Sequence, residues 1–153
     1  MIYQVLKNTF FALGIGFVAV IICGWLETEY LMTFFSANLI TILVALLAVN
    51  AATMGIVLTK IRDLIDGQDG GAGCFSETRR QMLLSVKEQV GLIILAILIL
   101  SIDQSPIVSS ISNVNLLIDA VVTAIFAYAL MVLYDTAKGV LIIVDYDAKD
   151  AER

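Results

Sequence analysis

The sequence predicts an all-α integral membrane protein with four transmembrane helices, and three observations lead to this fold class. Hydrophobic residues make up 60% of the 153 residues and charged residues only 15%. A soluble domain averages about 45–50% apolar and about 25% charged residues. The second observation is that the apolar residues are concentrated in four long stretches, which is typical of membrane-spanning helices.

The third observation is that all nine Lys and Arg residues fall on one side of this arrangement. The connections after the first and third apolar stretches contain Glu27, Glu29 and Asp103 but no base. The bases lie before the first stretch, between the second and third, and after the fourth: Lys7, Lys60, Arg62, Arg79, Arg80, Lys87, Lys138, Lys149 and Arg153. Short loops rich in Lys and Arg stay in the cytoplasm. We therefore expect a multi-pass inner-membrane protein with cytoplasmic N and C termini.

The first two helices are predicted over residues 8–26 and 33–66. The first ends near Trp25, a residue typical of membrane–water interfaces, and we expect it to remain as an anchor rather than be cleaved. The uncharged stretch of the second helix, Tyr30 to Thr59, is longer than a bilayer requires. Gly67 is suited to end this helix.

The third and fourth helices are predicted over residues 77–104 and 113–135. Pro106 disfavours continuation of the third helix. Around the glycine-rich segment 67–73, the ends of the second and third helices form a short cytoplasmic helical hairpin. Residues 1–153 thus form a single transmembrane domain with a cytoplasmic tail, 136–153. Apolar residues within the tail extend the fourth helix, pack under the bundle or form a strand.

The most specific pattern is a line of small and polar residues along the helix over 33–66, here called the small-residue seam. Alternating spacings of three and four put its members on one helix face: Asn38, Thr41, Ala45, Ala48, Ala52, Gly55 and Thr59. The first helix has a shorter line: Thr9, Ala12, Gly16, Ala19 and Cys23. Two interpretations remain open, namely close packing of the first helix on the second, or a seam that lines the axis of a homo-oligomeric pore. Asn50 and Thr53 lie off the seam, and we expect them to bond to a neighbouring helix.

The charged residues offer two further candidate sites. Asp119 is the acid that the prediction places inside a span, either as an interfacial acid near a helix N-terminus or as an ion or proton site. The bases around the hairpin orient the protein. In a symmetric oligomer they could also hold an anionic, phosphate-bearing ligand: Lys60, Arg62, Arg79, Arg80 and Lys87.

The sequence offers no catalytic constellation. It contains no His and two Cys, Cys23 and Cys74, which we expect to be reduced and unpaired. The lack of His disfavours common zinc and haem sites. The segment 67–73 lacks the Gly-Lys-Ser/Thr ending of a phosphate-binding loop. We find no nucleophile–base pair or metal cluster, so we expect no enzyme, no metal and no cofactor.

The layout of four short helices, no enzymatic domain and a basic cytoplasmic hairpin with Arg79 and Arg80 resembles the small membrane effectors of bacterial anti-phage defence, such as the membrane component of Hailong. The resemblance implies an oligomeric ion-conducting pore, controlled by a nucleotide or oligonucleotide, whose opening depolarises the infected cell. Three functions are therefore open. They are a homo-oligomeric channel or pore, a non-conducting scaffold or subunit of a membrane complex, and a small proton-coupled transporter that uses Asp119.

Overall fold

The computed structural model describes residues 2–66, 76–105 and 114–151, and α-helix is the regular secondary structure of these ranges. Four helices follow one another: α1 (Ile2–Trp25), α2 (Tyr30–Asp66), α3 (Ser76–Asp103) and α4 (Val114–Ala151). Each contains a segment that is long and apolar enough to cross a membrane. The predicted all-helical fold with four candidate membrane spans is confirmed. Pro106 and the glycine-rich segment 67–73 lie outside the described residues.

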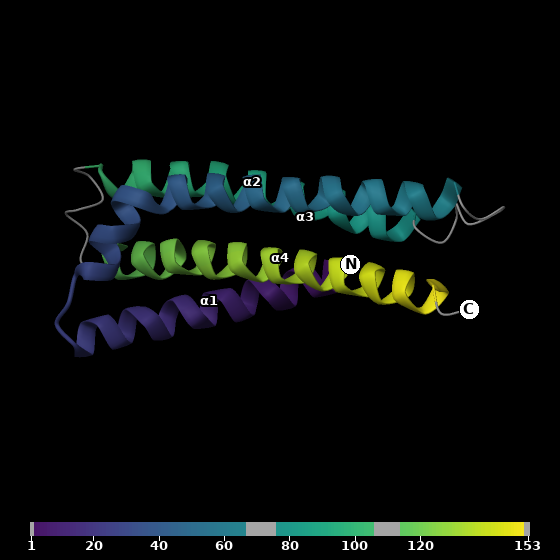
Figure 1. Ribbon diagram of the computed structural model, residues 1–153. Coiled ribbons are helices and arrows are strands. Elements are labelled where there is room, and N and C mark those ends of the chain that lie inside the picture. Colours follow the sequence, from purple (N-terminus) through teal and green to yellow (C-terminus); the bar gives the residue numbers. More distant parts are fainter. Residues whose placement is uncertain (1, 67–75, 106–113, 152–153) are drawn as a thin grey trace.

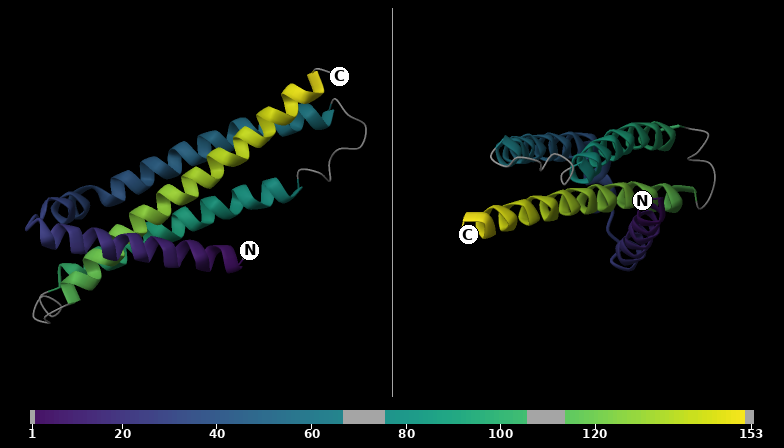
Figure 2. Two further views of the ribbon diagram at one scale, coloured as in Figure 1. Left: turned by 90° about the horizontal axis from the view of Figure 1, so that it is seen from below. Right: turned by 90° about the vertical axis from the view of Figure 1, so that its right-hand side faces the viewer.

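The helices are arranged around α4. In Figures 1 and 2, α2 and α3 lie side by side against one side of α4, while α1 crosses α4 on the other side. The chain direction alternates from one helix to the next. Lys60 and Lys138, late in α2 and α4, therefore lie toward the same end of the bundle as Arg80, early in α3. Glu27 and Asp103 lie toward the opposite end.

The packing of α1 on α4 depends on small residues. Ala12 and Gly16, one turn apart on α1, are buried, as are Ala120 and Ala124, one turn apart on α4. A Cβ atom added to Gly16 would overlap the backbone oxygen of Ala120 and lie 3.1 Å from the Cβ of Ala124. Small side chains let two backbones approach in lipid. The short line of small residues on the first helix thus packs on α4 at Ala12 and Gly16.

An apolar core joins α2, α3 and α4 on the other side. Leu39 and Leu43 of α2, Ala96 of α3 and Ile125 of α4 are buried together in it. The ring of Phe35 lies 5.1 Å from that of Phe126, centroid to centroid. Over half of the most apolar part of α4 is buried, against less than a fifth in each of the other helices. The bundle is therefore organised around α4, and the outer surfaces of α1, α2 and α3 remain uncovered.

The turn between α1 and α2 is fixed by backbone hydrogen bonds. The amide of Thr28 donates to the carbonyl of Cys23 at 3.1 Å, and that of Glu27 to Gly24 at 3.3 Å, which is the pattern of a Schellman cap. Glu27 occupies its left-handed position with φ 49°, where Gly is the usual residue. The Thr28 hydroxyl then accepts a bond from the amide of Tyr30 at 3.3 Å, which caps the start of α2. The turn holds α1 and α2 antiparallel.

Three helices extend beyond their predicted limits by three or more residues, and α2 is one of them because it begins at Tyr30 rather than at residue 33. α1 begins at Ile2 rather than at residue 8. α4 continues to Ala151 instead of ending at residue 135, so residues 136–151 extend the helix and do not form a separate tail. Of the three alternatives for the apolar residues after 139, the structure shows that they extend the fourth helix. No proline interrupts α4, and unbroken helix satisfies each backbone group within the segment.

A substitution at Gly16 tests the close contact of α1 with α4. Gly16→Ala places a methyl group against the backbone of Ala120, so the free energy of unfolding should fall by about 1–3 kcal/mol, as for other overpacked sites. Gly14→Ala is the matched control, because a Cβ at Gly14 meets nothing within 4 Å and Ala favours helix. Thermal unfolding of both variants in detergent measures the difference. Equal stability of the two variants would contradict the described contact.

Candidate functional site

The small-residue seam lies on the uncovered surface of α2. All seven members are exposed: Asn38, Thr41, Ala45, Ala48, Ala52, Gly55 and Thr59. Two polar members bond to their own helix, since the Asn38 amide donates to the carbonyl of Phe34 and the Thr59 hydroxyl to that of Gly55, each at 3.0 Å. These bonds lower the cost of polar groups in lipid. The seam is thus an unused face of small residues with its polar members near its two ends.

A buried cluster of polar side chains joins the other face of α2 to α3 and α4. The Asn50 amide donates to Gln89 Oε1 at 2.9 Å and to Ser85 Oγ at 3.3 Å. Thr136 of α4 reaches the same Ser85 hydroxyl at 3.5 Å. The expectation that Asn50 bonds to a neighbouring helix is confirmed. The same expectation for Thr53 is wrong, because its hydroxyl donates to the carbonyl of Val49 on its own helix.

The polar cluster is incompletely satisfied. Asn50 Oδ1 and Gln89 Nε2 are buried and have no hydrogen-bond partner among the described residues. When two side-chain amides share one hydrogen bond, the oxygen of one amide and the nitrogen of the other remain unpaired. Exchanging the oxygen and nitrogen positions in both amides leaves the same number of unpaired atoms. A buried unsatisfied polar atom costs about 1–3 kcal/mol. These two atoms therefore offset part of the stabilisation that the hydrogen bonds of the cluster provide.

Asp119 lies partly buried on α4, toward the end of the bundle that carries Asp103. Thr123, one turn further along and buried, donates to the backbone carbonyl of Asp119 at 2.9 Å rather than to its carboxylate. Asn115, one turn before, is exposed. Helical spacing places Asn115, Asp119 and Thr123 on one face, but they are exposed, partly buried and buried, respectively. In the described part of the chain, these three residues do not form a polar pocket together.

The candidate anion-binding bases lie toward the opposite end. Lys60 and Arg62 near the end of α2, and Arg80 and Lys87 in α3, are exposed. Arg79 lies in the first turn of α3, but its side chain is not among those described. Because α2 and α3 are antiparallel neighbours, the bases of both helices lie toward the same end of the bundle. A single protomer does not enclose them in a buried site.

Glu88 follows Lys87, one of the bases assigned above to the hairpin, yet it lies within the candidate span Arg80–Asp103. Its side chain lines a pocket together with that of Tyr128 on α4. Helical spacing was the available signal, since Glu88 shares a face with Leu92 and Leu95, which are four and seven residues further on. The protein thus holds a second acid between its helices besides Asp119.

Within the described ranges, no three His, Cys, Asp or Glu residues come together as a metal site. No protein-family model, curated protein or solved structure matches the chain. The class that the fold and these sites define is an all-helical protein with four candidate membrane spans, compatible with a multi-pass membrane protein.

A double-mutant cycle tests the polar cluster. Asn50→Leu and Gln89→Met should each lower the free energy of unfolding by about 1–3 kcal/mol, because each leaves the other amide buried without its partner. The double variant removes both and should cost less than the sum, with a coupling of about 0.6–1.7 kcal/mol. Thr53→Val is the control on α2, and its effect should be small because Thr53 bonds to its own helix. Strictly additive losses would contradict the cluster.

Proposed function

We propose that the protein is a homo-oligomeric membrane channel or pore in which the small-residue seam of α2 faces the symmetry axis. The observation that carries the proposal is that all seven residues of the seam are exposed. The comparable line on α1 is used against α4, whereas the seam has no helix packed on it within the described protomer. Small faces promote helix association in lipid, and identical subunits most often assemble with closed symmetry. A ring of α2 helices satisfies both conditions.

The order of residues along the seam suits a pore. Asn38 and Thr59 are about 32 Å apart along the helix at 1.5 Å per residue, close to the roughly 30 Å of bilayer hydrocarbon. Asn38 and Thr41 would form polar rings near one mouth and Thr59 near the other. Between them, Ala45, Ala48 and Ala52 would line an apolar constriction. Such a constriction gates by dewetting.

The basic end of the bundle extends the proposal to a regulated pore in the inner membrane. With this end in the cytoplasm, as the distribution of bases predicts, Lys60, Arg62 and Arg80 of each subunit would form rings near the inner mouth. Rings of bases suit a phosphate-bearing ligand such as a nucleotide or oligonucleotide. This agrees with the resemblance to ligand-controlled anti-phage effectors. Ligand binding would then weaken as salt concentration rises.

Cysteine substitution along α2 tests the axis. In a Cys23→Ser, Cys74→Ser background, Ala48→Cys should form disulfides between subunits, and a charged thiol reagent should reduce ion flux through liposomes at least about tenfold, because Ala48 lies at the constriction. Val49→Cys is the matched control: Val49 is 53% exposed and adjacent in sequence but lies off the seam. Conductance is measured with and without nucleotide ligands.

The possible results separate the pore from the scaffold. Cross-linking at Ala48 together with blocked conductance supports the pore. A stable oligomer that cross-links at Ala48 but conducts no ions with any ligand supports a non-conducting scaffold whose seam is a subunit contact. A monomer without conductance contradicts both, as does an equal response of the Ala48 and Val49 variants.

A proton-coupled transporter is the second candidate, and the partial burial of Asp119 between helices favours it. Asp119→Asn keeps the size of the side chain but removes the proton-binding group, so proton-driven uptake should fall at least about tenfold while assembly is unchanged. Glu29→Gln, at an exposed acid outside the candidate spans, is the control. Proton flux into proteoliposomes with a fluorescent pH indicator measures the effect, and unchanged flux removes Asp119 from the mechanism.

A further inference from the structure

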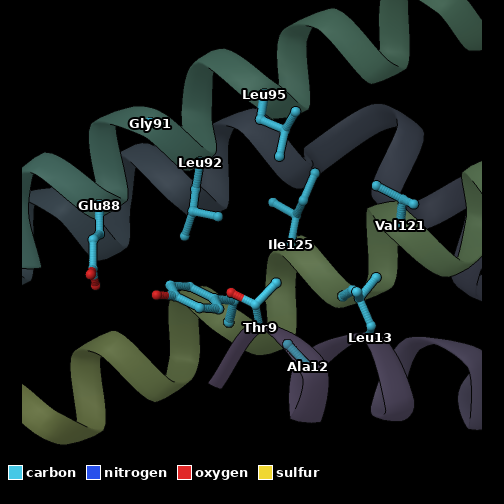
Figure 3. A pocket seen from close by; sticks show the side chains of 11 residues that line it. Thr9, Ala12, Leu13, Glu88, Gly91, Leu92, Leu95, Val121 and Ile125 are labelled. Atoms are coloured by element: carbon cyan, nitrogen blue, oxygen red, sulfur yellow. The ribbon is translucent and has the colours of Figure 1, made fainter. Parts of the chain in front are cut away.

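A pocket of about 270 Å³ lies between α1, α3 and α4, apart from the small-residue seam. Figure 3 shows Glu88 at one end of it and Leu13, Leu95 and Val121 toward the other. Apart from Glu88, Thr9 and the Tyr128 hydroxyl, the lining side chains are apolar. The pocket is therefore an apolar slot with one charged end.

The shape of the slot suits a single extended chain. Glu88 and Leu95 are about 10 Å apart along α3 at 1.5 Å per residue. Gly91, between them, lines the slot, and a Cβ added there would meet nothing within 4 Å, so glycine keeps this wall open. The volume is just below the roughly 300–1,000 Å³ of pockets for drug-sized ligands. An extended alkyl chain matches this length and volume.

The slot opens sideways from the bundle. Leu13 on α1 and Leu95 on α3 line it, and each side chain is about two-fifths exposed. Both lie within candidate membrane spans, so the opening lies at the depth of the lipid chains. A ligand with an apolar tail reaches the slot from the bilayer without crossing water.

The charged end favours a cation. Glu88 is partly buried and lies at one end of the slot, which the side chain of Tyr128 also lines. Asp135, one further acid on α4, adds negative potential at Glu88. Acids within spans are costly and are usually paired or functional. The aromatic ring of Tyr128 also lines the slot, and aromatic faces attract ammonium groups.

We propose that this slot binds a lipophilic cation, an ammonium group on a straight alkyl chain, with Glu88 as its counter-ion and the aromatic ring of Tyr128 beside the ammonium group. The alkyl chain lies along Leu92 and Leu95, and the ammonium group lies between the Glu88 carboxylate and the Tyr128 ring. The inference depends on the membrane-spanning fold and not on the proposed pore. A protein that conducts no ions still binds the cation.

The test uses the full chain in nanodiscs of zwitterionic lipid, titrated with decyltrimethylammonium. Native mass spectrometry counts the bound cations, and empty nanodiscs correct for partition into lipid. Wild-type protein should bind one cation per subunit. Glu88→Gln, which keeps the shape of the side chain, should weaken binding at least about tenfold because it removes the counter-ion. Decyl sulfate and decanol, which share the chain but not the charge, should bind at least about tenfold more weakly.

A second pair of variants tests the position of the ligand. Gly91→Leu fills the slot with a side chain that meets no protein atom at its base, so the variant should fold and bind no cation. Gly139→Leu, also in open space but outside the slot, should bind as the wild type does. Unchanged binding in Gly91→Leu overturns the site. Equal binding of decanol and the cation, or no effect of Glu88→Gln, overturns the cation and indicates an uncharged lipid chain.

Discussion

The close approach of α1 to α4 at Gly16 is the contact on which the arrangement of the bundle depends. Lipid offers no hydrophobic force to press helices together, so packing must come from van der Waals contact between close backbones. Gly16 permits this approach because it has no side chain to meet the backbone of Ala120. Ala120 and Ala124 provide the opposite small surface on α4. With α1 on this side of α4, its other side remains for α2 and α3.

This division explains why two similar lines of small residues have different surroundings. The line of small residues on α1 packs against α4, so it stabilises the protomer. The seam on α2 points away, because α2 uses the opposite face, with Leu39, Leu43 and Asn50, against its neighbours. A helix can pack within its own subunit through one face and remain available to another subunit through the other. The proposed assembly through the α2 seam follows from this geometry and not from the composition of the seam alone.

The polar groups inside the bundle also lie on two different sides of α3. Asn50 of α2 and Gln89 of α3 are buried and bond to each other, and one amide atom of each stays unsatisfied among the described residues. Glu88, one residue before Gln89, lies about 100° around α3 because the helix has 3.6 residues per turn. It therefore faces the slot beside α1 instead. Adjacent residues thus serve a packing cluster and a candidate ligand site.

The sequence by itself determined the all-helical class and the four candidate spans, because long apolar runs in lipid must satisfy their backbone groups within one segment. It also grouped the seven seam residues on one face, since that grouping needs only helical periodicity.

The sequence could not say which line of small residues packs inside the protomer, because both lines show the same helical spacing of small residues. It did not single out Glu88, because a charged residue next to Lys87 is typical of the end of an apolar stretch. Only the tertiary structure decided that α4 is central, that Gly16 faces Ala120, and that Glu88 and Tyr128 line one pocket. These facts depend on contacts between residues far apart in the chain, whose spacing no local pattern encodes.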